Sequence, residues 1–161
     1  MARGLQGVGC TGTLTIDGVL LNTPAWDLTD LTPLWVEATV RGGDRLLPGV
    51  AGVIPYRRRL DVTEHALPML ISGDVDEAGA DQANAWIGLE ANIETLRSTV
   101  IEPTNVGDGT RPATLTLPSG LTRTADVHVL GLRVSGAVGA GSSHALVRAV
   151  LQISVPAGRF A

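Results

Sequence analysis

The sequence contains no lysine, so all 12 of its basic residues other than histidine are arginines. Its 16 acidic residues leave a net charge of -4, which argues against a protein that coats nucleic acid. Cys10 is the only cysteine, which excludes an intrachain disulfide and any metal site built from several cysteines. No apolar run approaches the ~20 residues needed to span a bilayer, so we expect no membrane insertion.

Aromatic residues are also scarce, with one Phe, one Tyr and three Trp against 20 Gly and 9 Pro. This composition indicates short strands joined by many turns and argues against a deep aromatic ligand pocket. The N-terminus has Arg3 but no apolar run behind it, so we expect no signal peptide there. The 161 residues suit one domain with a proper core. We therefore expect a single β-rich domain over residues 1–161, with residues 1–11 as a flexible or interface arm.

Only the segment 81–100 has a convincing helical period. Its large apolar residues recur every three or four positions, at Trp86, Leu89, Ile93, Leu96 and Val100. This spacing predicts one buried stripe, with Trp86, Leu89, Ile93 and Leu96 docked on the core and Asn92 on the opposite, polar face. Asp81 is the expected N-cap, and Pro103 supplies the stop.

The rest of the sequence is typical of strands and turns. Asp17-Gly18 lies between two apolar runs and predicts a hairpin over residues 11–23. Pro33 breaks the mixed run over 26–40, which implies an edge strand or a bend there. Residues 136–143 are expected to form a flexible loop. Apolar and polar residues alternate clearly over 145–155, which indicates a strand with one buried face. The predicted fold is mainly β, an antiparallel β-sandwich or barrel with one α-helix packed on it.

The segment Gly7–Gly12 matches the dinucleotide-binding pattern G-x-G-x-x-G. That motif requires a strand before it and a helix after it. Here the motif follows the start of the sequence and precedes a Thr/Leu strand, so we reject nucleotide binding and expect no cofactor.

Asp74, Asp76 and Gly79 match three positions of an EF-hand calcium loop. Ala78 and Ala85 occupy two further ligand positions, so the loop lacks half of its charged oxygens. A solvated acidic turn beside a helix N-terminus is the better interpretation.

The three histidines, His65, His128 and His144, are far apart in the sequence, and no G-x-S-x-G nucleophile elbow occurs. We therefore expect no catalytic residues, no metal site and no enzymatic activity.

Residues 41–56 combine four glycines and two prolines with a run of apolar side chains. An ordinary surface loop would be more polar, so this segment is expected to lie against another surface. Three consecutive arginines, 57–59, follow it and suit an ion-paired strand or subunit contact better than nucleic acid. The predicted subunit interface comprises Arg41, Leu46, Leu47, Pro48, Val50, Val53, Ile54, Tyr56, Arg57, Arg58 and Arg59.

Five segments together resemble the distal tail proteins, or minor tail components, of long-tailed phages. They are Asp17–Asn22, Arg41–Gly52, Arg58–Asp61, Ile71–Asp74 and Val155–Phe160. The resemblance implies a β-sandwich with a flanking helix that assembles into a six-fold ring. Such a ring joins the tail tube to the tip or baseplate, which makes the tube protein and the tip hub protein the expected partners beside the chain itself.

The resemblance also implies a virion protein, assembled in the host cytoplasm, that meets DNA only in transit through the ring. A tail tube or tail-completion subunit is the nearest alternative, because tube proteins are similar in fold. From other classes, a monomeric β-sandwich that binds sugar or peptide and an unrecognised hydrolase stay open. A heterologous ring needs two different patches on each subunit, and residues 41–56 are expected to supply one of them.

Overall fold

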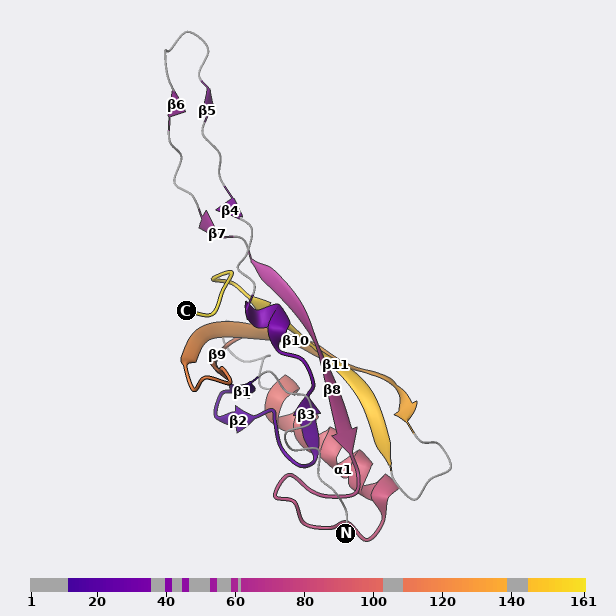
Figure 1. The fold of residues 1–161 in the computed structure, drawn as a ribbon. Coiled ribbons are helices and arrows are strands. Elements are labelled where there is room, and N and C mark those ends of the chain that lie inside the picture. Colours follow the sequence, from indigo (N-terminus) through magenta and orange to yellow (C-terminus); the bar gives the residue numbers. More distant parts are fainter. Residues whose placement is uncertain are drawn as a thin grey trace.

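The computed structural model describes residues 12–35, 62–102, 109–138 and 145–161, together with four two-residue strands between positions 36 and 61. A single seven-stranded antiparallel sheet forms the body, and one helix packs against it (Figure 1). The strands of this sheet are β1 (Thr13–Ile16), β2 (Val19–Leu20), β3 (Trp26–Leu28), β8 (Thr63–Ser72), β9 (Thr110–Thr116), β10 (Thr122–Val138) and β11 (Leu146–Val155).

The strand order across the sheet is β2-β1-β9-β10-β11-β8-β3. The long strand β10 holds the two halves together, since residues 122–128 pair with β9 and residues 128–138 pair with β11. Two register shifts interrupt the second pairing, one between Val129 and Gly131 and one between Val134 and Gly136. Such bulges bend a strand and increase its twist, so β10 curves from one half of the sheet into the other.

The short connection between the two edge strands requires the sheet to curl. Leu20 ends β2 and Trp26 begins β3, and six residue steps reach at most ~21 Å. A flat sheet of seven strands would separate its edges by ~29 Å. The sheet therefore curves into a half-barrel, and the predicted antiparallel β fold with one packed helix is confirmed.

Hydrogen bonds of Asn22 connect strands β1 and β3, near the two edges of the curled sheet. The Asn22 Oδ1 accepts a hydrogen bond from the Leu14 amide on β1 at 3.0 Å. Its Nδ2 donates to Asp27 Oδ1 on β3 at 2.6 Å. The indole Nε1 of Trp26 adds a bond to the Leu20 carbonyl at 3.3 Å. Because Asn22 is buried, these bonds also satisfy polar groups that would otherwise be costly to remove from water.

The core lies on the inner face of the curled sheet, where alternate side chains of every long strand are buried. Asp17 and Gly18 both have positive φ values, 50° and 80°, which confirms the hairpin predicted between β1 and β2. The alternation predicted over residues 145–155 is confirmed as β11, whose odd-numbered residues from 147 to 155 are all buried. Pro33 falls in a short 3-10 helix, η1 (Thr32–Trp35), which follows β3.

The helix begins three residues later than its sequence predicts. Helix α1 spans Ala85–Leu96 and continues as a π-helical turn, η2 (Arg97–Ile101). Asn84, and not Asp81, is the N-cap, and its Oδ1 accepts hydrogen bonds from the amides of Trp86 and Ile87. Asp81 instead forms a β-bridge with Val75 within the preceding loop. Both residue types cap helices well, so the loop pairing decides where the helix starts.

The predicted core role of Trp86 is wrong, because its side chain is 46% exposed. The buried face of α1 is centred on Gly88, Leu89, Asn92 and Leu96. With roughly 100° between successive residues, Trp86 lies about a quarter turn away from the centre of that face. Leu89 and Leu96 are buried, and Ile93 packs against the core while partly exposed.

Asn92 lies on the buried face and not on the polar face where the sequence pattern places it. Its Nδ2 donates to the carbonyls of Ser72 at 2.7 Å and Val75 at 2.8 Å. These two carbonyls belong to the segment that leaves β8, so Asn92 fixes the helix to the end of the strand.

Two glycines allow the backbones of α1 and β8 to touch. A Cβ atom added to Gly88 would lie 2.3 Å from the Gly73 carbonyl oxygen, and one added to Gly73 would lie 1.8 Å from the Ala85 carbonyl oxygen. Neither position has room for a side chain. The contact explains why a glycine, Gly88, lies on the buried face of the helix.

Arg111 anchors the other end of the helix. Its guanidinium is buried and donates to the carbonyls of Thr99 and Val100 in η2. It also contacts Asp17 Oδ2 in the β1–β2 turn at 3.1 Å. A cation beside the last carbonyls of a helix satisfies groups that have no partner within the helix. Strand β9 therefore fixes both the helix end and the hairpin turn.

Candidate oligomer interface

Four short strands form a ribbon that projects from the body (Figure 1). Strands β4 (Val40–Arg41) and β7 (Arg59–Leu60) pair with each other, and so do β5 (Arg45–Leu46) and β6 (Val53–Ile54). The two ladders lie one beyond the other, with β5 and β6 farther from the sheet (Figure 1). We call these four strands the ribbon. Both pairings are antiparallel, and the inner pair in the sequence, β5 with β6, lies between the two strands of the outer pair.

The structure places part of the predicted interface in this ribbon. Arg41 pairs with Arg59, Leu46 pairs with Val53, and Ile54 pairs with Arg45. The other predicted interface residues lie outside the described residues, and they are Leu47, Pro48, Val50, Tyr56, Arg57 and Arg58. Their role as a subunit contact stays a prediction. So does that of residues 1–11, which also lie outside the described part of the chain.

The outer face of the sheet has two regions of different character. Across β1, β9 and the first half of β10, the outward residues are mainly threonines, and the register aligns them in two rows. One row contains Thr13, Thr116 and Thr122, and the other contains Thr15, Thr114 and Thr124. Threonine combines a high β propensity with a hydroxyl group that water can solvate. This region suits exposure to solvent.

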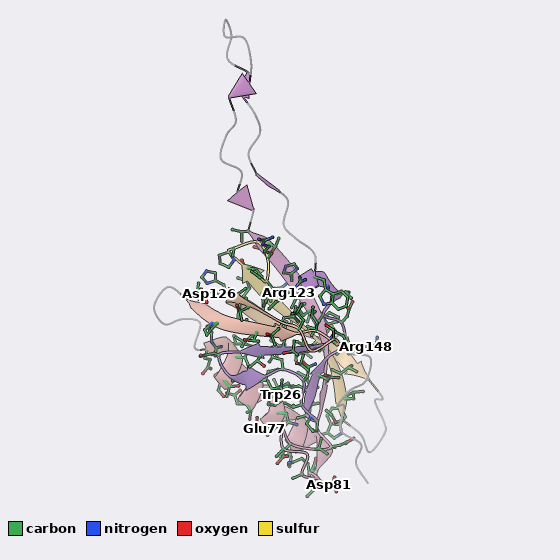
Figure 2. The ribbon with its side chains drawn as sticks, turned by 60° about the vertical axis from the view of Figure 1, so that its left-hand side comes forward. Trp26, Glu77, Asp81, Arg123, Asp126 and Arg148 are labelled. Carbon is green, nitrogen blue, oxygen red and sulfur yellow. The ribbon has the colours of Figure 1, made fainter. Side chains whose placement is uncertain are left out.

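The second region, on the far half of β10 with β11 and β8, is more apolar. Leu130, on β10, is 52% exposed. A shallow groove of about 420 Å³ crosses β8 and β11 here, lined among others by Pro68, Leu70 and Val150. Figure 2 shows Asp126 and Arg148 at opposite sides of the molecule, one in each region. Exposed apolar side chains gathered on one part of a sheet are typical of an interaction surface.

No group of three or more His, Cys, Asp or Glu side chains among the described residues could hold a metal ion. In the acidic loop, Asp76 Oδ1 accepts hydrogen bonds from the amides of Ala78 and Ala80 and so stabilises the turn itself. Figure 2 shows Glu77 and Asp81 in this loop at the end of the molecule near α1. No helix in the described part of the chain is long and apolar enough to cross a membrane.

One buried carboxyl group has an unusual environment. Burial raises the pKa of Asp27 above its ordinary value of 3.8, and the hydrogen bond from Asn22 opposes that rise only in part. Asp27 Oδ2 has no hydrogen-bond partner among the described atoms. Burial of Oδ2 without a partner disfavours the charged form of this carboxyl group. Its role is structural, since it closes the sheet through Asn22.

The fold is similar to that of a solved phage protein. The crystal structure of SPP1 Dit, described as a paradigm of the hub adsorption apparatus in phages that infect Gram-positive bacteria, matches with a TM-score of 0.57. The match covers 91% of this chain at 18% sequence identity.

The chain has a Dit-type fold.

The resemblance of the sequence to distal tail proteins is thus confirmed at the level of the fold. The chain spans about half of the Dit protein, since the match covers 50% of that longer chain. No protein-family model matches the sequence, and no curated protein shows significant similarity to it.

The exposed residues of β10 were not predicted from the sequence. Residues 136–143 were expected to form a flexible loop, whereas β10 runs to Val138. The alternation of Leu130, Leu132 and Val134 with Gly131 and Arg133 was the available signal. It was weak because the two bulges break the period of two that identifies a strand.

Proposed function

We propose that this chain is a structural subunit of a bacteriophage tail. In this proposal six copies form a ring at the distal end of the tail tube, and the ring joins the tube to the tail tip or baseplate. The observation that carries the proposal is the Dit-type fold over nearly the whole chain. The ribbon and the apolar region of the sheet support it, because a ring subunit needs surfaces for its neighbours.

The ribbon gives the physical reason for assembly. A two-stranded ribbon without a third strand or a packed face is marginally stable in water. The sequence from Val40 to Leu60 nevertheless carries Leu46, Leu47, Val50, Val53 and Ile54. Each such side chain gains ~1.5–3 kcal/mol on full burial, which opposes the entropy lost on ordering a glycine-rich segment. Contact with the next copy in the ring is the burial that we propose.

The other partners follow from the position in the tail. A ring between tube and tip contacts the tube protein on one face and the tip hub protein on the other. DNA passes through its lumen without being bound specifically, in agreement with the negative net charge of the chain. The protein then resides in the virion after assembly in the host cytoplasm.

The test is the oligomeric state of the purified full chain, measured by light scattering after size exclusion and by electron microscopy of the particles. We expect a closed ring for the natural sequence. Replacing Leu46 and Leu47 together by Asp should abolish the ring and leave the circular dichroism spectrum unchanged. The matched control replaces Thr122 and Thr124 by Asp, which adds the same charge to the solvated threonine face.

Two outcomes would contradict the proposal. A monodisperse monomer at every concentration would favour a monomeric binding module instead of a ring subunit. A double Asp variant that assembles normally would exclude the ribbon as a subunit contact. If that variant lowers the stability of the monomer, the ribbon packs on its own subunit.

A further inference from the structure

The turn between β1 and β2 contains a reactive pair of residues, Asp17 and Gly18. Asp-Gly occurs only twice in the sequence, here and at residues 108–109, and Asp108 lies outside the described residues. In such a pair the backbone nitrogen of glycine can attack the side-chain carboxyl carbon of aspartate, because glycine has no Cβ to block the approach. The product is a succinimide ring, which water opens to aspartate or to isoaspartate.

The backbone of Asp17 is strained in the folded protein. Its φ is 50°, and it is the only residue other than glycine with a positive φ in the described part of the chain. The left-handed region is costly for residues with a Cβ, although aspartate tolerates it better than most. In isoaspartate the main chain runs through Cβ, which adds a rotatable bond and lets the turn leave this region. Isomerisation therefore relieves the strain.

The turn also leaves room for the ring and for water. A Cβ atom added to Gly18 would meet no atom within 4 Å, so the space around this residue is open. The Asp17 side chain is 54% exposed, and water can reach its carboxyl carbon. The Gly18 amide forms no hydrogen bond with the described residues. No such bond has to break before its nitrogen reacts.

One contact restrains the Asp17 carboxylate. Its Oδ2 accepts a hydrogen bond from Arg111 Nη2 at 3.1 Å. The Arg111 side chain is 6% exposed and is fixed by the carbonyls of Thr99 and Val100 in η2. A carboxylate bound to a fixed cation has lost the freedom to rotate toward Gly18. An ion-paired carboxylate also accepts a nucleophile poorly, because the reaction must expel one of its oxygens as water.

We propose that Asp17 is a modification site that isomerises spontaneously to isoaspartate, and that Arg111 restrains the reaction. In the first step a bond forms between Gly18 N and Asp17 Cγ, and the hydroxyl of the neutral carboxyl group leaves with the amide proton as water. In the second step water adds to one of the two ring carbonyls, and the C–N bond at that carbonyl breaks. Cleavage at Cγ restores aspartate, and cleavage at the main-chain carbonyl gives isoaspartate. The two steps together consume nothing.

The modification affects more than the turn. Isoaspartate adds one carbon to the main chain of a two-residue turn, so the pairing of Ile16 with Val19 is disturbed. Its carboxylate is attached directly to Cα and no longer meets Arg111 in the same geometry. The buried guanidinium then loses its carboxylate partner, which destabilises the end of η2. In a virion, as proposed above, the chain is not replaced, and modified copies accumulate with the age of the particle.

The first experiment measures isoaspartate in the folded full chain during storage for weeks at neutral pH. Methylation by an isoaspartate methyltransferase counts the modified residues, and peptide mass spectrometry separates the peptide of Asp17 from that of Asp108. We expect isoaspartate at residue 17 to accumulate in the folded chain, more slowly than in the chain unfolded in guanidinium chloride. Asp17→Glu is the control for the assignment, since glutamate would need a larger ring, and it should give no signal at this position.

The second experiment tests the restraint. Arg111→Met removes the guanidinium and keeps a long side chain. It should raise the rate at residue 17 about tenfold, the rate equivalent of one charge-assisted hydrogen bond. Leu96→Ala is the matched control, because it destabilises the helix and leaves the ion pair in place. Its rate should stay within about twofold of the natural rate, as for sites without a shared partner.

The outcomes are distinct. If isoaspartate at residue 17 appears only in the unfolded chain, Asp17 is not a modification site of the folded protein. If Arg111→Met and Leu96→Ala raise the rate equally, loss of stability and not loss of the ion pair releases the reaction. If Arg111→Met does not fold, the natural chain is compared in dilute and concentrated sodium chloride, where screening of the pair should raise the rate. An unchanged rate would exclude the restraint. None of these results depends on ring formation, so they leave the proposed function untouched.

Discussion

Gly88→Ala provides a sharp test of how α1 is docked, because two effects of opposite sign compete there. Alanine is the better helix former, and at an exposed interior position the change stabilises by ~1 kcal/mol. Here the new Cβ would lie 2.3 Å from the Gly73 carbonyl oxygen, where 3.0 Å is about the closest approach that such atoms adopt. The helix and the end of β8 would have to separate by about 0.7 Å, the difference between these two distances.

That separation disturbs contacts that depend on close approach. The bonds from Asn92 Nδ2 to the Ser72 and Val75 carbonyls, at 2.7 and 2.8 Å, would lengthen with it. Overpacking of this kind costs ~1–3 kcal/mol, so the net effect should be destabilising despite the gain in helix propensity.

Urea unfolding followed by circular dichroism measures the difference in free energy of unfolding. Ala91→Gly is the matched control on the exposed side of the same helix, where the loss of propensity alone should cost ~1 kcal/mol. Opposite substitutions in one helix should therefore both destabilise. A Gly88→Ala variant that is as stable as the natural chain, or more stable, would refute the close backbone contact.

Three further predictions concern the core. Leu96→Ala should lower the free energy of unfolding by ~2–5 kcal/mol, whereas Trp86→Ala should lower it clearly less because that side chain is half exposed. Equal losses in urea unfolding would show that Trp86 is buried and that the helix is rotated from the orientation described here. Asn92→Leu should cost ~1–3 kcal/mol because two buried carbonyls lose their donor, whereas the exposed control Glu90→Gln should change little. Asp27 has a raised pKa, so the folded state binds its proton more tightly than the unfolded state and stability falls as pH rises from 3.8 through the folded pKa. Asp27→Asn should remove this fall in stability. If the stability difference between the variant and the natural chain does not change from pH 3.5 to 7, the pKa of Asp27 is not raised.

The sequence predicted those parts of the fold that short-range chemistry controls. Asp17-Gly18 forms its turn because few residues other than glycine adopt positive φ cheaply. Strand β11 was predicted because burial on one face imposes a period of two. The edges of the sheet and the end of β10 depend on pairings between distant residues, which no local pattern reports.

The helix shows where local reasoning fails. The sequence pattern favoured Trp86 for the core because it is large and apolar, and Asn92 for the surface because it is polar. The close contact between Gly73 and Gly88 rotates the helix, so Asn92 faces the core and Trp86 faces outward. For the candidate interface, the sequence predicted an apolar arm, and the structure adds the ladders of the ribbon but leaves its contacts as predictions.

The pairing of β1 with β9 has a consequence for synthesis on the ribosome. Thr13 pairs with Thr116, so the first hairpin is made about a hundred residues before its partner strand exists. At ~5–20 residues per second, that interval lasts on the order of 5–20 s. During this time Leu14 and Ile16, which the finished protein buries completely, have no sheet to cover them. The nascent chain thus presents an apolar hairpin that chaperones can bind until β9 has been made.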